Sequence, residues 1–137
     1  MRITVSVDSD ATHRLLRRSP SAAARATDGT LNDASSLYLL DLKDYPPSRP
    51  GSNYKRTRTL ARAWSRQFSG SGLTRSVLIG SNRNIAPYNR RVQDETMQAR
   101  IHGIVWREKT VQAVHRRNER RVGEFLQRRV DREFANL

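Results

Sequence analysis

The sequence predicts an α+β fold: a small antiparallel sheet packed by a long N-terminal helix and a long C-terminal helix, with an extended proline-rich basic loop. Three observations support this prediction. Short segments alternate apolar and polar residues, two long segments repeat apolar residues at helical spacing, and prolines and basic residues gather between the helices. The 137 residues are expected to form a single domain, residues 1–137.

The chain begins with a predicted strand and a predicted short helix. Apolar and polar residues alternate from Arg2 to Val7, which indicates a strand with one buried face. Polar capping residues follow at positions 8–10, and the short helix is expected to end at about Arg18.

A longer helix is predicted over residues 20–43. Ser19 is a favourable cap, and Pro20 occupies the first helical position, where proline is tolerated. The two prolines after Tyr45 cannot continue the helix. Gly29 is expected to weaken its middle by about 1 kcal/mol. The residues that recur at helical spacing are Ala23, Thr27, Leu31, Ala34, Tyr38 and Leu42.

Shorter elements are predicted in the middle of the chain. A helical turn over residues 60–63 leads into an alternating strand over 64–68, and a Ser-Gly-Ser-Gly turn leads into a strand over 74–80. Pro87 is expected to open a short helix, and a third strand is expected over 101–106.

Residues 108–135 predict the C-terminal helix. Apolar residues fall on one broad face, and most arginines fall on the opposite face. The apolar positions are Val111, Val114, Val122, Phe125, Leu126 and Val130, and the basic positions are Arg116, Arg117, Arg120, Arg121 and Arg128.

The positive charge is unevenly distributed. The formal net charge is +13, and 23 of the 26 basic residues are arginines. Residues 1–44 are neutral, whereas residues 45–100 carry eleven basic groups against Asp94 and Glu95. The positive region begins at the extended loop, residues 45–59. Such a surface suits either arginine-rich protein interfaces or nucleic acid, and composition does not choose between them.

The sequence predicts no enzyme. The three histidines, His13, His102 and His115, have no metal-ligand spacing, and we expect His115 to be a hydrogen-bonded residue at the edge of the last helix's apolar face. The Asp94–Glu95 pair favours an ion pair over acid–base chemistry. We expect no cofactor, no metal and no small-molecule substrate. The apolar runs are too short for a membrane span, and the first residues do not form a signal peptide.

A nucleic-acid-binding protein is the second interpretation, since a basic chain attracts polyanions in a salt-dependent manner. Stacking aromatics are available at Tyr54, Trp64 and Tyr88, although the alternating pattern around Trp64 favours burial. No recognised nucleic-acid-binding motif is present, so only nonspecific DNA affinity is predicted. The arginines expected to share one basic surface are Arg56, Arg58, Arg62, Arg66, Arg75, Arg83, Arg90 and Arg91.

The segment "YPPSRPGSNYKRTRTLARAW", residues 45–64, resembles part of the tailed-phage neck and tail-completion proteins, which are minor tail components at the head–tail junction. In that family a helix ends in a Tyr-Pro-Pro element, and later landmarks follow at similar spacing. The resemblance covers residues 40–110, and Arg58 departs from it, because relatives often carry glycine at this position. If that glycine serves a positive-φ turn, the local turn is expected to differ here. The matching landmarks are Tyr45, Pro46, Pro47, Tyr54, Arg56, Thr57, Leu60, Trp64, Ala86, Pro87, Tyr88, Val92, Gln93, Gln98, His102 and Trp106.

The resemblance implies a structural virion protein that joins head to tail as a head–tail connector, tail terminator or tail-completion ring. It implies a homo-oligomeric ring of six or twelve copies, assembled in the host cytoplasm. Other neck and tail proteins are the expected partners, with nonspecific contact to packaged DNA and no membrane.

The extended loop is expected to dock on neighbouring subunits, because it leaves a sharply ended helix and returns to the core. The expected interface residues are Tyr45, Pro46, Pro47, Arg49, Tyr54, Lys55, Arg56, Arg58, Arg90 and Arg91. The expected core anchors are Leu60, Trp64, Phe68, Tyr88, Trp106 and Phe125.

Overall fold

The computed structural model describes residues 2–6, 9–45, 50–51, 53, 57–93, 96 and 109–137. It confirms the predicted α+β fold, with a three-stranded antiparallel sheet and long helices near both ends of the sequence. Val7 and the predicted strand at 101–106 lie outside the described residues. The elements are β1 (Arg2–Ser6), α1 (Asp10–Arg18), α2 (Pro20–Lys43), α3 (Thr59–Ala63), β2 (Trp64–Ser69), the 3₁₀ helix η1 (Gly72–Thr74), β3 (Ser76–Ser81), α4 (Asn89–Val92) and α7 (Val111–Ala135).

The sheet has the order β1-β3-β2, so β3, the last of the three strands in the sequence, lies between the other two. Val77 of β3 is paired with Val5 of β1 and with Phe68 of β2. The turn between β2 and β3 needs glycine at position 70, where φ is +73° and an added Cβ would lie 2.4 Å from the carbonyl oxygen of Thr74. The predicted Ser-Gly-Ser-Gly turn is therefore a real chain reversal.

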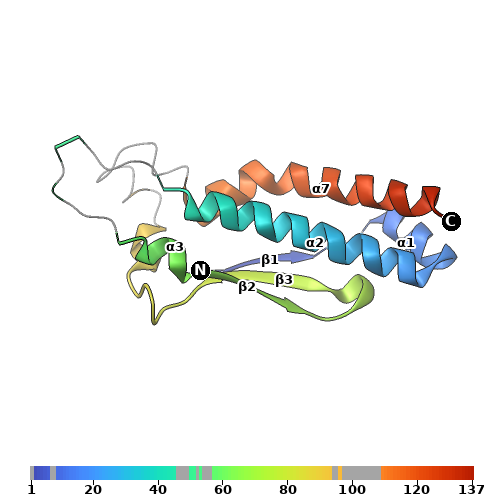
Figure 1. Cartoon of the computed structure of the whole chain (residues 1–137), viewed down its shortest axis with the longest axis horizontal. Helices are drawn as coiled ribbons and strands as arrows, with labels where there is room; N and C mark the ends of the chain where they lie inside the picture. The colour runs from blue at the N-terminus through green and yellow to red at the C-terminus, as the bar shows by residue number, and fades with distance from the viewer. Residues whose placement is uncertain are drawn as a thin grey trace.

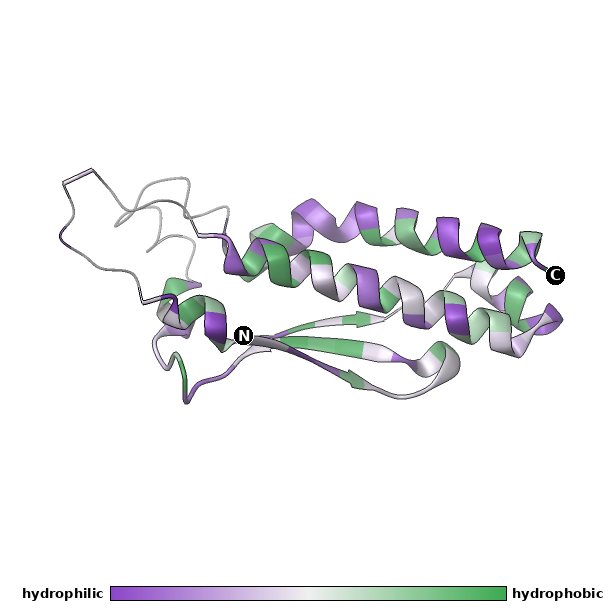
Figure 2. Cartoon of the chain, viewed as in Figure 1, coloured by the Kyte–Doolittle hydropathy of each residue, from purple (hydrophilic) through white to green (hydrophobic). Residues whose placement is uncertain are grey.

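Helices α2 and α7 lie side by side and antiparallel along one face of the sheet (Figure 1). Ser19 caps α2 as expected, since its Oγ accepts a hydrogen bond from the Ala22 amide, and Thr110 caps α7, since its Oγ1 accepts one from the Ala113 amide. Most of β3 is coloured as hydrophobic in Figure 2, whereas much of α7 is hydrophilic. Only one stripe of α7 thus contributes to the core.

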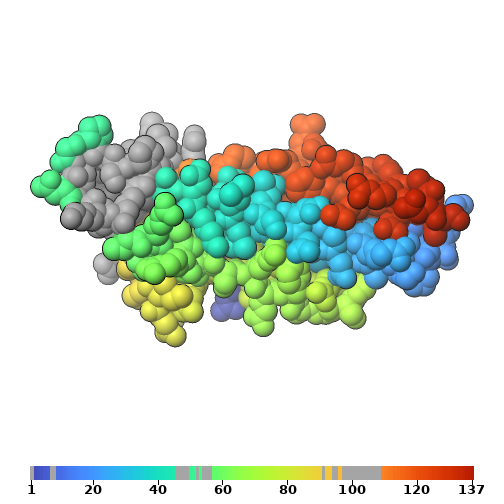
Figure 3. Space-filling model, viewed as in Figure 1, coloured from blue at the N-terminus to red at the C-terminus, as the bar shows by residue number. Residues whose placement is uncertain are grey.

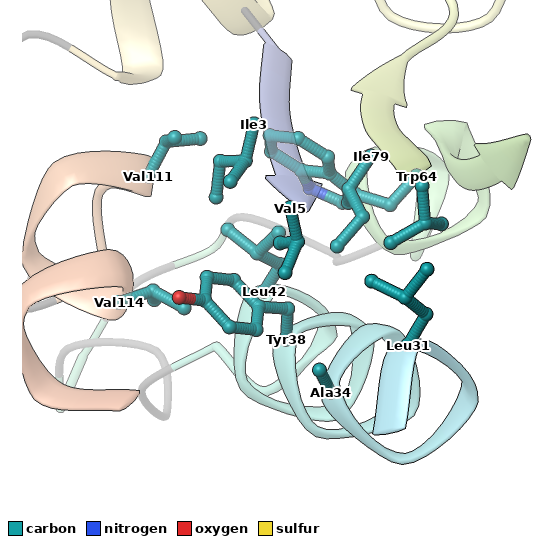
Figure 4. Close-up of a cluster of buried hydrophobic side chains, with 11 residues drawn as sticks. Ile3, Val5, Leu31, Ala34, Tyr38, Leu42, Trp64, Ile79, Val111 and Val114 are labelled. Atoms are coloured by element: carbon teal, nitrogen blue, oxygen red, sulfur yellow. The ribbon is translucent and has the colours of Figure 1, made fainter. Parts of the chain in front are cut away.

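The main core lies between the sheet, α2 and α7 (Figure 4). Its largest members include Tyr38 of α2 and Trp64 at the start of β2, which are 1% and 2% exposed. The full cluster comprises Ile3, Val5, Leu31, Ala34, Tyr38, Leu42, Trp64, Val77, Ile79, Val111 and Val114. Its members come from both ends of the sequence, so this core brings together segments that are far apart in the chain.

Tyr38 and His115 connect α2 to α7 at the edge of this core. The Tyr38 hydroxyl and Nδ1 of His115 are 2.8 Å apart, so the two side chains share a hydrogen bond. Burial, assisted by the negative charge of Glu119, raises the pKa of Tyr38 to about 12. His115 is therefore hydrogen-bonded, as expected from its place on the helix.

A second cluster packs α1 against α2 and α7. It is made of Leu15, three alanines of α2 (Ala22, Ala23 and Ala26) and Val130 of α7. Alanine side chains let the helix axes approach closely, so little apolar volume is needed to fill this region. We call α1, the first turns of α2 and the last turns of α7 the helical end of the molecule (Figure 3).

Gly29 has a packing role that its helix propensity does not indicate. An added Cβ would lie within 2.6 Å of three guanidinium atoms of Arg129, which crosses α2 at this point. Arg129 continues to Asp33, where Nη2 and the carboxylate are 2.7 Å apart. Gly29 thus leaves room for an ion pair that links α7 to α2.

Asn118 lies on the buried stripe of α7, although no polar residue was expected there. It is 1% exposed, and its Nδ2 donates hydrogen bonds to Asp41 and to the Val114 carbonyl oxygen. These bonds satisfy a buried amide, which would otherwise be costly.

Two predicted core anchors are corrected by the structure. Tyr88 is 44% exposed, whereas Ala86, two positions earlier in the sequence, is buried with 1% exposure. Phe125 is partly buried outside both core clusters, with the Arg128 guanidinium 5.1 Å from its ring centroid. Trp64 and Phe68 do contact the core, Leu60 is half-buried in α3, and Trp106 lies outside the described residues.

Candidate subunit interface

A hydrogen bond joins two distant landmarks of the proline-rich segment. Nε1 of the buried Trp64 donates to the hydroxyl oxygen of Tyr45, at 2.9 Å. Burial raises the pKa of the Tyr45 hydroxyl, the bond from Trp64 partly opposes that rise, and the nearby Tyr88 adds to it. Tyr45 follows the end of α2 and Trp64 begins β2, so the two ends of this segment lie next to each other.

Arg58 precedes α3 in a backbone conformation that normally favours glycine. Its φ and ψ are 58° and 17°, in the left-handed region, and it has the only positive φ among the described non-glycine residues. This conformation costs a non-glycine residue about 1 kcal/mol or more. Arg58 thus keeps a left-handed turn, and its side chain is exposed.

The turn after β3 is held to this end of the molecule by backbone and side-chain hydrogen bonds. The Asn82 amide donates to the Ala63 carbonyl oxygen at 2.8 Å, which ties the turn to α3. Gln93 is 6% exposed, and its Oε1 accepts a 2.6 Å hydrogen bond from the amide of Val111 at the start of α7. Gln93 therefore connects this turn to the C-terminal helix.

We call Asp44–Tyr45, residues 57–64 and residues 82–93 the loop end. Among the described residues it carries two of the large apolar side chains that remain exposed, Ile85 at 41% and Tyr88 at 44%. The exposed arginines of this end are Arg58, Arg62, Arg83 and Arg90. Apolar side chains beside arginines are a typical composition for a protein interface.

The predicted basic surface is smaller than expected. Arg66 points to α2, where its Nη1 donates hydrogen bonds to Ser35 Oγ at 2.8 Å and Ser36 Oγ at 2.9 Å. Arg75 lies 3.2 Å from a carboxylate oxygen of Asp28, and its guanidinium, like that of Arg66, lies over the Phe68 ring. Both arginines therefore serve to attach the sheet to α2.

Several predicted site residues lie outside the described part of the chain, and so does the Asp94–Glu95 pair. Arg91 belongs to α4, but its side chain is also outside it. Gln93 was named only as a landmark of the resemblance and was not predicted as a site residue, and its bond to Val111 joins positions that no local pattern relates. The undescribed interface residues are Pro46, Pro47, Arg49, Tyr54, Lys55 and Arg56.

The comparisons with known proteins identify no relative. No protein-family model, curated protein or solved structure matches this chain. Among the described residues, no group of three or more His, Asp or Glu side chains is arranged to hold a metal ion. None of the helices described here is long and apolar enough to cross a membrane.

Proposed function

We propose that this chain is a structural subunit of a tailed-phage neck, which joins head to tail by docking its loop end on neighbouring subunits. The hydrogen bond between Trp64 and Tyr45 is the observation that carries this proposal. These residues bound the segment that resembles the neck and tail-completion proteins, and both are held at the core. A segment anchored at both ends loses less conformational entropy on docking than a free arm.

Further support comes from the surroundings of this segment. Arg58 retains an unfavourable left-handed conformation, and backbone strain of this kind often occurs at functional sites. Ile85 and Tyr88 expose apolar surface beside arginines, which would be buried in a subunit contact. A closed ring of six or twelve copies would bury such patches in heterologous contacts between successive subunits.

The location of the chain in assembled particles tests this proposal. Antibody-labelled particles examined by electron microscopy should carry the label at the junction of head and tail. Particles made without the chain should accumulate as separate heads and tails. Label confined to the capsid shell, or absent from complete particles, would contradict the proposal.

The oligomeric state gives an independent test. We expect the purified chain to form a closed assembly in light scattering, alone or with the other neck proteins. A chain that remains monomeric in both conditions would argue against a ring subunit.

The alternative function is nonspecific DNA binding, and the net charge of +13 favours it. A subunit that only docks on proteins should bind DNA weakly at about 150 mM salt. Tight DNA binding by a strictly monomeric chain would favour the alternative.

A further inference from the structure

A hollow lined by arginines lies at the helical end, far along the molecule from the loop end. It has a volume of about 370 Å³ and is lined by Arg14, Arg17, Arg18 and Phe134. The three arginines belong to α1 and Phe134 to the last turn of α7. These two segments lie at the same end of the molecule in Figures 1 and 3.

The three arginines are concentrated on one side of α1. Their spacing of three and four residues places them as neighbours on one helical face. The Arg18 guanidinium lies 5.7 Å from the centroid of the Phe134 ring, which holds it at the rim of the hollow. All three side chains are exposed, so their charges are accessible to a ligand.

No described acidic residue forms an ion pair with Arg14, Arg17 or Arg18. The nearby carboxylates of α7 have other partners: Glu133 forms an ion pair with Arg25 at 2.7 Å, and Asp131 accepts a hydrogen bond from Gln127. Like charges one turn apart repel each other, and a bound anion would relieve that repulsion.

We propose that this hollow binds the phosphate backbone of nucleic acid. Three guanidinium groups that lie close together on one helix suit a ligand with closely repeated negative charges. Duplex DNA carries about one charge per 1.7 Å of its axis, and arginine pairs with phosphate oxygens through two parallel hydrogen bonds.

This inference does not depend on the neck function and differs from the sequence-based prediction about DNA. The sequence placed the basic surface between residues 45 and 100. In the structure Arg66 and Arg75 of that region contact side chains of α2, whereas Arg14, Arg17 and Arg18 lie in the part of the sequence that is formally neutral.

Two triple variants with the same loss of charge test whether nucleic acid binds at the hollow. The first changes Arg14, Arg17 and Arg18 to glutamine, and its matched control changes the exposed Arg2, Arg120 and Arg121, which lie outside both the hollow and the loop end, to glutamine. Binding of a fluorescent 30-base-pair duplex is measured by anisotropy between 50 and 200 mM salt. Circular dichroism verifies that both variants are folded.

We expect the first variant to make the slope of log affinity against log salt shallower by about 2.7, because each lost phosphate contact removes about 0.9. At 50 mM salt this variant should bind at least tenfold more weakly than the wild type, and the control should bind within about threefold of it. If the triple variant does not fold, Arg14→Gln and Arg17→Gln should each reduce the slope by about 0.9.

Three results would overturn the proposal. Equal weakening by the two triple variants would show that total charge, and not the hollow, attracts the duplex. Absence of wild-type binding at 50 mM salt would exclude the site altogether. Displacement of the duplex by a polyglutamate peptide at an equal concentration of charge would assign the hollow to an acidic protein.

Discussion

The main core, to which the loop end contributes Trp64, is made mostly of large side chains from several elements, whereas at the helical end small alanines of α2 meet Leu15 and Val130. Trp64 at the loop end also makes a specific hydrogen bond to Tyr45. At the helical end the buried Thr12 shares a 2.7 Å side-chain hydrogen bond with Ser9, the cap of its own helix, so this bond does not join two distant segments, and the shape of this end follows from helix packing. We therefore expect the loop end to be sensitive to loss of volume and the helical end to gain of volume.

The largest effect is expected from removing Trp64. Trp64→Ala should lower the free energy of unfolding by about 3–5 kcal/mol, because it leaves a cavity in the main core and removes the bond to Tyr45. Urea unfolding followed by circular dichroism measures this loss. Tyr45→Phe is the matched control for the hydrogen bond and should cost about 1 kcal/mol. A loss for Trp64→Ala no larger than that of the control would show that Trp64 is not a core anchor.

Alkaline pH is expected to weaken the core through Tyr38. Burial raises its pKa to about 12 from an ordinary value of 10. The preference of the folded state for neutral Tyr38 therefore contributes fully to the free energy of unfolding below pH 10. This contribution is lost as the pH rises through 12, and its upper limit is about 2–3 kcal/mol. Urea unfolding between pH 8 and 11.5 measures the loss. Tyr38→Phe should lack this part of the pH dependence, and identical curves for the two proteins would contradict the assignment.

At the helical end, gain of volume should be the harmful change. Ala26 is 1% exposed between α1, α2 and α7, so Ala26→Leu should lower stability by about 1–3 kcal/mol through overpacking. Thermal unfolding measures the difference. Ala135→Leu is the control, since Ala135 is exposed at the end of α7 and its substitution should change stability by less than about 0.5 kcal/mol. Equal effects would mean that the helices are not closely packed at Ala26.

The smallest predicted effect on stability concerns Arg58. Arg58→Gly should raise the free energy of unfolding by about 1 kcal/mol, because glycine adopts the left-handed conformation without steric cost. The same substitution should weaken association of the loop end, since it removes an exposed guanidinium. Denaturant unfolding and sedimentation measure the two effects. A destabilised variant would show that the backbone at position 58 is not strained.

The regular elements of the fold were predictable because their side chains follow simple periods. Alternation located β1, β2 and β3, and helical spacing with Ser19 and Pro20 located α2. Asn118 could not be predicted, because a polar residue at a core position depends on a partner, Asp41, that is 77 positions away in the sequence.

The candidate site was only partly predictable for the same reason. The Tyr45–Trp64 bond and the contact between Gln93 and the start of α7 join residues that no local pattern relates. Alternation correctly placed Arg66 on the same side of β2 as Trp64, but it did not show that this side faces α2. Tyr88 was predicted to be a core anchor because it is aromatic. It is exposed in the structure, and the smaller Ala86 nearby is buried.

One matched pair of substitutions tests most directly whether the loop end is the docking surface. Ile85→Asp adds a charge to an exposed apolar residue of the loop end, and Leu137→Asp makes the same change at the helical end, where Leu137 is 61% exposed. The self-assembly of both variants, alone and with the partners proposed above, is measured by sedimentation velocity. We expect Ile85→Asp to remain monomeric and Leu137→Asp to assemble like the wild type. Assembly of the Ile85→Asp variant, with loss of assembly for Leu137→Asp, would contradict docking through the loop end.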